Sequence, residues 1–358
     1  MKKYVGAGEK FLSWDNENFV YCGRMDFAYE GGPLWVYPCS FVKVKFIGKS
    51  IKAVVTNIRS YWGNSVGWIL DGEEGKADLP DEGCACITIA ENLEEKEHEL
   101  CFFKRMDSCH MMVFHGFVAD EAVEILKAEP LSERRMEVYG DSVSAGKVSE
   151  AVDYCGMPDP EHNGEFSNSY YSYAWLTARR LNATLHDIAQ GGIALFDGTG
   201  WFNGPDTMGL LSMYDKIQYM PGKCVPKKWD FTKYTPQVVI LAFGQNDNHP
   251  EDYMKEDYDG SKARKWRQGY LDFIRTIRSI YPECHIICKT TILGHDFNWD
   301  YAIEECVKNC GDDKVHYFKY SNNSIGTQGH IRKPEAEQMA QELSCFIENL
   351  NKKYSFWE

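Results

Sequence analysis

The pattern of short segments along the chain changes near residue 130, and no other feature of the sequence constrains the fold as much. Before this point, strand-like segments are separated by Gly, Asp and Glu turns. In SFVKVKFIG at residues 40–48, for example, apolar residues alternate with lysines. Alternation with a period of two is typical of a half-buried strand. No helical pattern lies between these segments, so we predict an all-β sandwich, similar to a jelly roll, for residues 1–130.

Strand-like and helix-like segments alternate after this point. The apolar run VVILA at residues 238–242 is typical of a strand covered on both faces. An amphipathic helical pattern follows, and Pro282 ends it. Strands that alternate with helices of ten or more residues are typical of a mostly parallel sheet with helices on its faces. We therefore predict an α/β domain over residues 131–358, joined to the sandwich by the polar stretch KAEPLSERR.

Composition and charge narrow the class of protein. A chain of 358 residues with 44% hydrophobic residues is long enough to bury two cores. Its formal net charge of −14 disfavours binding to phosphates, so we expect neither a nucleic-acid partner nor a membrane partner. The first residues carry two lysines but no apolar segment of a secretory leader. We expect a cytoplasmic protein with free thiols, or a secreted one if a leader has been removed.

Polar motifs follow the predicted strands of the second domain, at the edge where parallel sheets bind their ligands. The tripeptide GDS at residues 140–142 follows MEVY, and GQND at residues 244–247 follows VVILAF. His330 lies in the loop SNNSIGTQGHIRKP, just ahead of the last predicted helix. A glycine pair, Gly191 and Gly192, follows a fourth predicted strand. We therefore expect these motifs to meet at one edge of the sheet.

Together these motifs contain the groups that ester hydrolysis requires. Ser142 is a weak nucleophile until a base accepts its proton, and the imidazole of His330 has a suitable pKa for that role. The oxyanion of the tetrahedral intermediate needs fixed hydrogen-bond donors. A backbone N–H beside Gly192 and the side-chain amide of Asn246 are suitable donors. The alternative for Ser142 alone is an ordinary turn serine.

The order of the motifs resembles the sequence blocks of the SGNH (GDSL-like) hydrolases. The early segment CGRMDFAYEGGPLWVYPCSFVKVKF looks like the opening of carbohydrate esterase family two, in which a β-sandwich precedes an SGNH domain. The resemblance implies that Ser142 is the nucleophile and His330 the base. It implies an oxyanion hole formed by the N–H groups of Ser142 and Gly192, with Gly191 as the alternative glycine, and by the Asn246 side chain. It also implies removal of O-acetyl groups from xylan or mannan without a metal or cofactor.

One position departs from the pattern of the SGNH hydrolases. These enzymes commonly have an aspartate three residues before the histidine, and this chain has Thr327 there. We therefore expect a Ser142–His330 dyad in which a carbonyl of Gln328 or Gly329, or the Thr327 hydroxyl, accepts the imidazole Nδ1–H. Two other carboxylates are alternatives for this role: Asp296 and Asp300.

Contacts with substrate are assigned to three further residues: Asp141, Trp201 and Trp299. Both tryptophans fall in segments that read as strand-end loops, and sugars stack on exposed aromatic faces. Packing in the core is the alternative interpretation for each tryptophan. We also regard the sandwich domain as a candidate for carbohydrate contact.

Two other patterns receive a structural interpretation. The sequence GNSVG at residues 63–67 matches a nucleophile elbow, but strand-like segments flank it on both sides, so we predict a hairpin turn. Cys109, His110 and His115 are potential metal ligands. On a strand, the two histidines would point to opposite faces, so we predict no metal site.

The sequence therefore predicts a serine esterase that removes O-acetyl groups from acetylated hemicellulose oligosaccharides through an acetyl-enzyme. Two alternatives stay open. An SGNH lipase or thioesterase would need a long apolar groove, whereas the predicted catalytic loops are polar and rich in Trp, Asn and Asp. A carbohydrate-binding protein with an inactive SGNH domain would bind oligosaccharide without cleaving an ester through Ser142.

Overall fold

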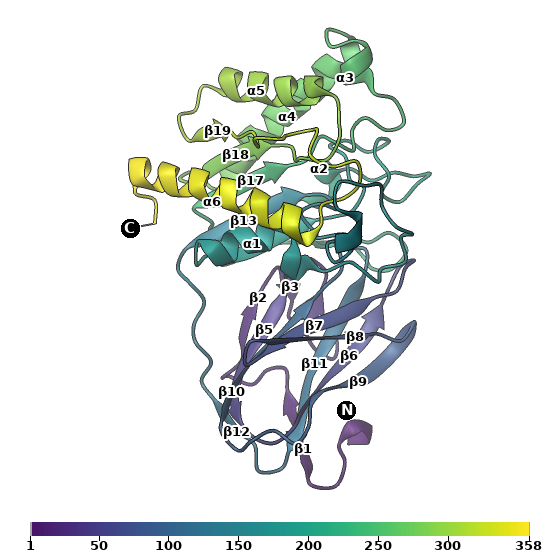
Figure 1. Ribbon diagram of the computed structural model, residues 1–358, viewed down its shortest axis with the longest axis vertical. Coiled ribbons are helices and arrows are strands. Elements are labelled where there is room, and N and C mark those ends of the chain that lie inside the picture. Colours follow the sequence, from purple (N-terminus) through teal and green to yellow (C-terminus); the bar gives the residue numbers. More distant parts are fainter. Residues whose placement is uncertain (1, 358) are drawn as a thin grey trace.

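Two antiparallel sheets face each other in the N-terminal third of the chain. The computed structural model describes residues 2–357. One sheet has the order β3-β4-β11-β6-β9 with β1 paired to β11, and the other has the order β12-β5-β10-β7-β8 with β2 paired to β5. The strands are β1 (Glu9–Ser13), β2 (Val20–Cys22), β3 (Met25–Asp26), β4 (Leu34–Trp35), β5 (Phe41–Ile47), β6 (Ile51–Ile58), β7 (Ser65–Leu70), β8 (Glu73–Asp78), β9 (Glu82–Ala90), β10 (Glu97–Lys104), β11 (Met111–Asp120) and β12 (Glu124–Leu126). The predicted sandwich is confirmed (Figure 1).

Strand β5 shows why these residues form a sandwich. Val42, Val44 and Phe46 are buried, whereas the lysines between them are only partly buried. The buried side chains join Trp35 and Phe102 in a core between the sheets. Burial of apolar side chains from both inner faces is the main force that holds two such sheets together.

A parallel five-stranded sheet forms the second domain, with the order β14-β13-β17-β18-β19. Its strands are β13 (Arg135–Gly140), β14 (Thr184–Ala189), β17 (Val238–Ala242), β18 (His285–Lys289) and β19 (Val315–Tyr317), and a separate hairpin contains β15 (Lys216–Gln218) and β16 (Lys227–Lys228). The helices are α1 (Tyr173–Arg180), α2 (Leu210–Met213), α3 (Tyr253–Glu256), α4 (Ser261–Ile280), α5 (Phe297–Cys310) and α6 (Lys333–Tyr354), with short 3₁₀ turns η1 (Lys2–Tyr4), η2 (Val152–Tyr154), η3 (Ser169–Tyr171) and η4 (Phe231–Lys233). The predicted α/β class is confirmed.

Helices cover both faces of the parallel sheet. Helices α1 and α6 pack on one face and α4 and α5 on the other (Figure 1). Strand β17 lies in the middle of the sheet, and all five of its residues are buried. This two-sided burial explains its unbroken apolar sequence. The polar residues after β13 and β17 consequently lie at one edge of the sheet, where the two parallel strands end.

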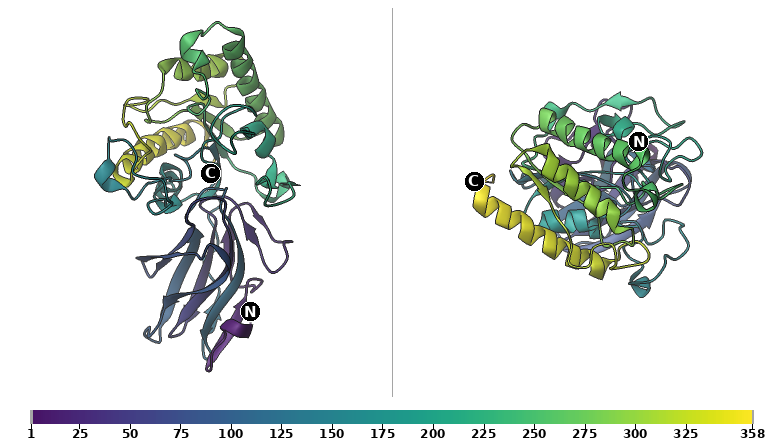
Figure 2. Two further views of the ribbon diagram at one scale, coloured as in Figure 1. Left: turned by 90° about the vertical axis from the view of Figure 1, so that its right-hand side faces the viewer. Right: turned by 90° about the horizontal axis from the view of Figure 1, so that it is seen from above.

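The two domains are stacked end to end and share part of one core (Figure 2). Leu34 and Met111 of the sandwich pack in the same cluster as the residues of the α4 and α5 face. A fully buried ion pair joins Arg24 of the sandwich to Glu137 of β13, with 3.1 Å between the charged atoms. The domains therefore form a packed interface, and side chains from the sandwich can reach the end of the parallel sheet.

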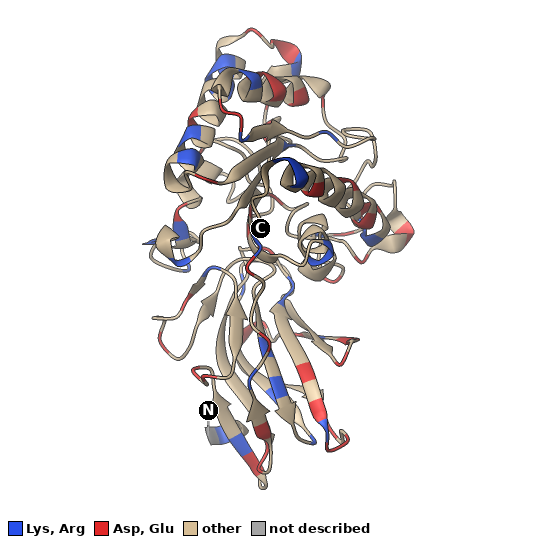
Figure 3. Cartoon of the chain, turned by 90° about the vertical axis from the view of Figure 1, so that its left-hand side faces the viewer, with Lys and Arg blue, Asp and Glu red and all other residues tan. Residues whose placement is uncertain are grey.

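Three further features concern the surface charge, the helices and the cysteines. Acidic and basic residues are interspersed on both domains in the view of Figure 3. Within residues 2–357, no helix combines the length and apolar composition that would be needed to cross a membrane. All thirteen cysteines are free thiols.

Candidate active site

Ser142 lies on a tight turn directly after β13. The Asp141 carboxylate accepts the N–H of Val143 at 3.0 Å, and the Asp141 carbonyl accepts the N–H of Ala145 at 3.0 Å. A side chain at Gly140 would place its Cβ 2.2 Å from the Ser144 hydroxyl, so only glycine fits there. The turn presents Ser142 to a cavity of about 600 Å³ at the carboxyl end of the sheet.

His330 reaches Ser142 from a loop ahead of α6. The Ser142 hydroxyl donates to His330 Nε2 at 2.8 Å, across 188 residues of chain. Burial lowers the pKa of His330, an effect that its hydrogen bond to Asp159 opposes and the nearby charge of Lys147 reinforces. A neutral imidazole in hydrogen-bond contact with a hydroxyl is the arrangement that general-base catalysis needs.

Asp159 holds the imidazole, so the dyad predicted from the sequence is wrong. Its Oδ2 accepts the Nδ1–H of His330 at 2.5 Å, and its Oδ1 accepts the backbone N–H of His330 at 2.8 Å. Arg332 forms an ion pair with the same carboxylate at 3.0 Å, and His162 donates to it at 2.9 Å. Burial alone would raise the pKa of Asp159, but hydrogen bonds from His162 and His330 outweigh burial and lower the pKa. Asp159 is therefore ionised at neutral pH and can stabilise a protonated imidazole.

None of the side chains expected to orient His330 accepts its Nδ1–H. The Thr327 hydroxyl is buried and has no partner among residues 2–357. Asp296 caps α5 by accepting the N–H of Asn298, and Asp300 accepts a hydrogen bond from Thr290 at 2.5 Å. A carboxylate is a stronger acceptor than a carbonyl or hydroxyl, and Asp159 occupies the position behind the imidazole.

Donors for an oxyanion converge on the same cavity. Gly191 is excluded because its N–H donates to the Asp107 carboxylate at 3.0 Å. The N–H groups of Ser142 and Gly192 have no acceptor within the described part of the chain. Gly192 has a positive φ of 76°, and it lines the cavity together with Asn246. This geometry favours Gly192 over Gly191 as the backbone donor.

Two of the three predicted substrate contacts are wrong. Asp141 is fully buried, and its Oδ2 accepts hydrogen bonds from the amides of Gln245 at 2.7 Å and Asn246 at 3.1 Å. It therefore positions the Asn246 amide instead of meeting substrate. Trp299 lies inside α5, is fully buried, and donates its indole N–H to Asp252 at 3.0 Å. The core alternative holds for this tryptophan because α5 begins at Phe297, ahead of it.

Trp201 lies on the cavity wall. Its side chain is 61% exposed, and its ring stacks on His249 with 3.4 Å between the ring centroids. An exposed aromatic face beside the Ser142 hydroxyl is suited to stacking against a sugar ring. Trp201 therefore remains a candidate for substrate contact.

The sandwich domain contributes residues that the sequence analysis did not assign to the site. Tyr61 and Trp62 line the same cavity as Ser142 and His330. They lie in the connection from β6 to β7, and the sequence GNSVG begins in this connection and continues into β7. This connection crosses from one sheet to the other, so the predicted hairpin turn is wrong. Two adjacent aromatic residues in a polar loop are the signal that could have suggested a binding surface.

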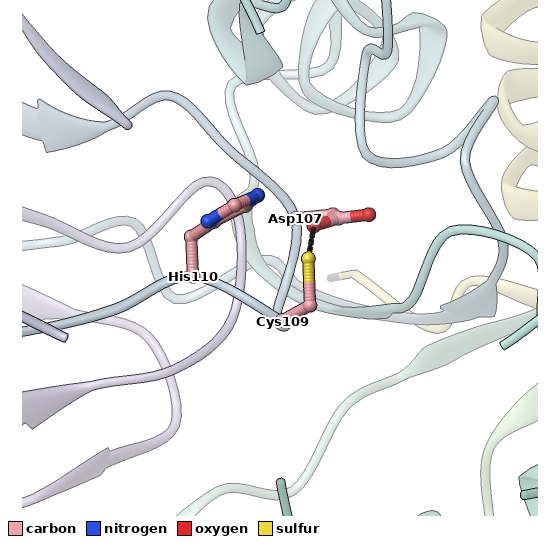
Figure 4. Close-up of side chains that lie close together, drawn as sticks. All are labelled: Asp107, Cys109 and His110. Carbon is pink, nitrogen blue, oxygen red and sulfur yellow. Dashed lines mark hydrogen bonds between the residues drawn. The ribbon is translucent and has the colours of Figure 1, made fainter. Parts of the chain in front are cut away.

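Asp107 is the second contribution of the sandwich. Figure 4 shows it with Cys109 and His110 in the loop between β10 and β11. The Cys109 thiol donates to Asp107 Oδ1 at 2.7 Å, and Gly191 occupies Oδ2. His115 lies in β11, outside this loop, and its imidazole forms a hydrogen bond with the Thr56 hydroxyl. The hydrogen bonds therefore make the Asp107 carboxylate a link between this loop and the glycine pair.

A serine, histidine and aspartate in hydrogen-bond series, at the end of a parallel sheet with helices on both faces, are the arrangement typical of a serine hydrolase of the SGNH type. Comparison with known proteins narrows this class. A family model described as "Carbohydrate esterase 2 N-terminal" matches residues 21–128. The resemblance of this chain to carbohydrate esterase family two is therefore confirmed.

Relatives and solved structures of this kind match both domains. The cellulase/esterase CelE of Acetivibrio thermocellus is 29% identical over 94% of this chain and 40% of the relative. The acetylxylan esterase/glucomannan deacetylase of Cellvibrio japonicus is 27% identical over 69% of this chain and 66% of the relative. A family two carbohydrate esterase from Clostridium thermocellum, solved with cellohexaose, has a TM-score of 0.79 and 26% identity over 94% of this chain and 99% of that structure. The chain thus spans less than half the length of CelE.

Proposed function

We propose that this chain is a serine esterase that removes O-acetyl groups from acetylated hemicellulose oligosaccharides, of xylan or mannan type. The observation that carries the proposal is the series of hydrogen bonds from Ser142 through His330 to Asp159 at an aromatic-walled cavity. The curated relatives, whose names include acetylxylan esterase and glucomannan deacetylase, support the same class of substrate.

The reaction follows from the positions of these groups. His330 Nε2 accepts the Ser142 proton while Oγ attacks the acetyl carbonyl, and Asp159 stabilises the imidazolium that forms. The N–H groups of Ser142 and Gly192 and the Asn246 amide bind the oxyanion. His330 then protonates the departing sugar hydroxyl, and water repeats the sequence on the acetyl-enzyme. Ser142, Gly192, Asn246 and His330 line the cavity, and Asp159 lies behind His330.

The cavity walls favour a sugar over a long acyl chain. Its lining combines the polar side chains of Lys147, His162 and Asn203 with the apolar ones of Phe202 and Met220, and a long alkyl chain would remove the polar groups from water. Tyr61, Trp62 and Trp201 provide aromatic faces for a sugar ring. An acetyl esterase therefore fits better than the lipase or thioesterase alternative.

Release of acetate from acetylated xylan and acetylated mannan, measured side by side, tests the proposal. Ser142→Ala should lower the rate by at least about 10³-fold, since it removes the nucleophile. A comparison of p-nitrophenyl acetate with a long-chain p-nitrophenyl ester should show a preference for acetate. Binding of oligosaccharide without Ser142-dependent acetate release would overturn the proposal in favour of a binding protein.

A further inference from the structure

Lys147 presents a positive charge to the candidate active site. Its backbone N–H donates to the Ser142 carbonyl at 3.0 Å, which places it on the next turn after the nucleophile. Its side chain lines the same cavity as Ser142 and His330, and Nζ lies 4.2 Å from the centroid of the Trp62 ring. Within residues 2–357, the ammonium group forms no hydrogen bond and no ion pair.

The nearby carboxylates already have other partners. Asp159 pairs with Arg332 and accepts hydrogen bonds from two imidazoles. Asp107 accepts hydrogen bonds from Gly191 and Cys109. The ammonium of Lys104 lies beside Asp107, with its Nζ 2.6 Å from the Asp107 carbonyl oxygen. Neither carboxylate is therefore a partner reserved for Lys147.

The third carboxylate, Asp141, is enclosed in the wall behind the nucleophile. It accepts hydrogen bonds from Val143, Gln245 and Asn246, and the charge of Lys289 also acts on it. Lys147 is thus the cation of the cavity that has no carboxylate in direct contact. Burial lowers the pKa of Lys147, which is the effect of a charge removed from water without a close counter-ion.

We propose that Lys147 binds a carboxylate on the sugar substrate, so that the enzyme prefers acetylated oligosaccharides that contain a uronic acid. The inference rests on the esterase function proposed above and names its substrate class more narrowly. A sugar bound in the cavity that Lys147, Trp62 and Trp201 line would bring its ring substituents within reach of the ammonium group. A uronic acid differs from a neutral hexose by one carboxylate, which is the group that this cation would recognise.

A matched pair of small substrates tests the proposal. Methyl glucuronoside and methyl glucoside, each with one acetyl group on the same hydroxyl, differ only in a carboxylate against a hydroxymethyl group. The measured quantity is the ratio of kcat/KM for the glucuronoside to kcat/KM for the glucoside. The ratio should exceed one in the native protein and fall on the order of tenfold in Lys147→Met, because a charge-assisted hydrogen bond is lost.

Three comparisons make the result specific. Lys147→Arg should retain most of the preference, since it keeps the charge. Lys308→Met, which removes a 70% exposed lysine side chain from α5, should leave the ratio unchanged. Added salt should lower the ratio in the native protein but not in Lys147→Met. Any effect of Lys147 on His330 cancels in the ratio, because both substrates use the same base.

The outcomes separate this inference from the esterase proposal. A native ratio near one, or a ratio unchanged in Lys147→Met while both esters are still cleaved through Ser142, would overturn the inference and leave the esterase function standing. If the native protein cleaved neither ester, the esterase function itself would be rejected. Acetate is the other carboxylate that could reach Lys147. If Lys147→Met weakens inhibition by acetate but keeps the ratio, the cation binds the product and the inference is wrong.

Discussion

Asp159 shows how much one side chain contributes to the candidate site. Its two oxygens accept hydrogen bonds from the imidazole and the backbone N–H of His330. The same carboxylate forms an ion pair with Arg332 and accepts a hydrogen bond from His162. The carboxylate comes from a loop 171 residues before the histidine. The requirement for an acceptor behind the imidazole is therefore spatial, and any loop that reaches this point can meet it.

Asp159→Asn should lower kcat for an acetyl ester on the order of 10²- to 10⁴-fold, since an amide can hold the wrong imidazole tautomer and lacks the charge that stabilises imidazolium. KM should change little, because Asp159 lies behind the base. Steady-state kinetics measure both values. Thr327→Ala is the matched control and should keep nearly the native kcat. If Thr327→Ala lowered kcat as much as Asp159→Asn, Thr327 would orient His330, as the sequence predicted.

The pH profile should report the charge of Lys147. His330 acts as a base only when neutral, so its lowered pKa extends activity to a lower pH than an ordinary histidine would allow. Lys147→Met removes a nearby positive charge and should raise this pKa. The acid limb of kcat/KM should then move to higher pH, whereas Lys147→Arg should keep the native profile. A limb that stays in place or moves to lower pH in Lys147→Met would show that the charge of Lys147 does not lower the pKa of His330.

The loop between β10 and β11 is an element of the sandwich that supports catalysis in the other domain. Asp107 binds the N–H of Gly191, and the Ser108 hydroxyl donates to the Ala189 carbonyl at 2.7 Å. These contacts hold the segment that presents Gly192 to the cavity. The sandwich is consequently part of the candidate active site, and the parallel sheet alone would lack this support.

Asp107→Ala should lower kcat on the order of 10- to 10²-fold, less than the loss of an oxyanion donor itself, because the glycine segment gains freedom. Asp107→Asn should keep most of kcat, since its amide oxygen can still accept the Gly191 N–H. The readouts are kcat and the midpoint of thermal unfolding. Equal kcat in the native protein, Asp107→Ala and Asp107→Asn would refute a positioning role. A lower kcat in Asp107→Ala that returns to the native value at temperatures where the variant is fully folded would also refute it.

At the scale of the whole molecule, the two domains depend on each other through a buried polar contact. Arg24 donates to Glu137 at 3.1 Å, and the hydroxyls of Tyr139 and Tyr281 donate to the same carboxylate at 2.6 and 3.1 Å. Both charged side chains are fully buried. Loss of one partner leaves the other charge without compensation in the shared core.

Arg24→Met should lower the free energy of unfolding by about 3–5 kcal/mol, as expected when one partner of a buried ion pair is removed. Urea denaturation followed by tryptophan fluorescence measures this change. The double variant Arg24→Met with Glu137→Gln should recover part of the loss, because it removes the unpaired charge. A loss in Arg24→Met as small as that for an exposed pair such as Lys314 and Glu283 would argue against an uncompensated buried charge.

Several features could be predicted because each depends on residues close together in the chain. The lysine alternation in β5 and the apolar run of β17 report which faces are buried, and both predicted strands are present. The polar residues after β13 and β17 lie at one sheet edge because parallel strands end together. His330 could be proposed from its chemistry, although the sequence did not indicate which acceptor lies behind it.

The amino-acid sequence by itself determined the two classes of domain and the chemical types of the candidate groups, since hydrophobic period and functional-group chemistry are local properties. Only the tertiary structure decided that Asp159 lies behind His330, that Asp107 supports the glycine pair, that Trp299 is core and that Lys147 faces the cavity. These four outcomes depend on which loops and helix faces meet in space. These contacts depend on packing between segments far apart in the chain, and local sequence patterns do not predict them.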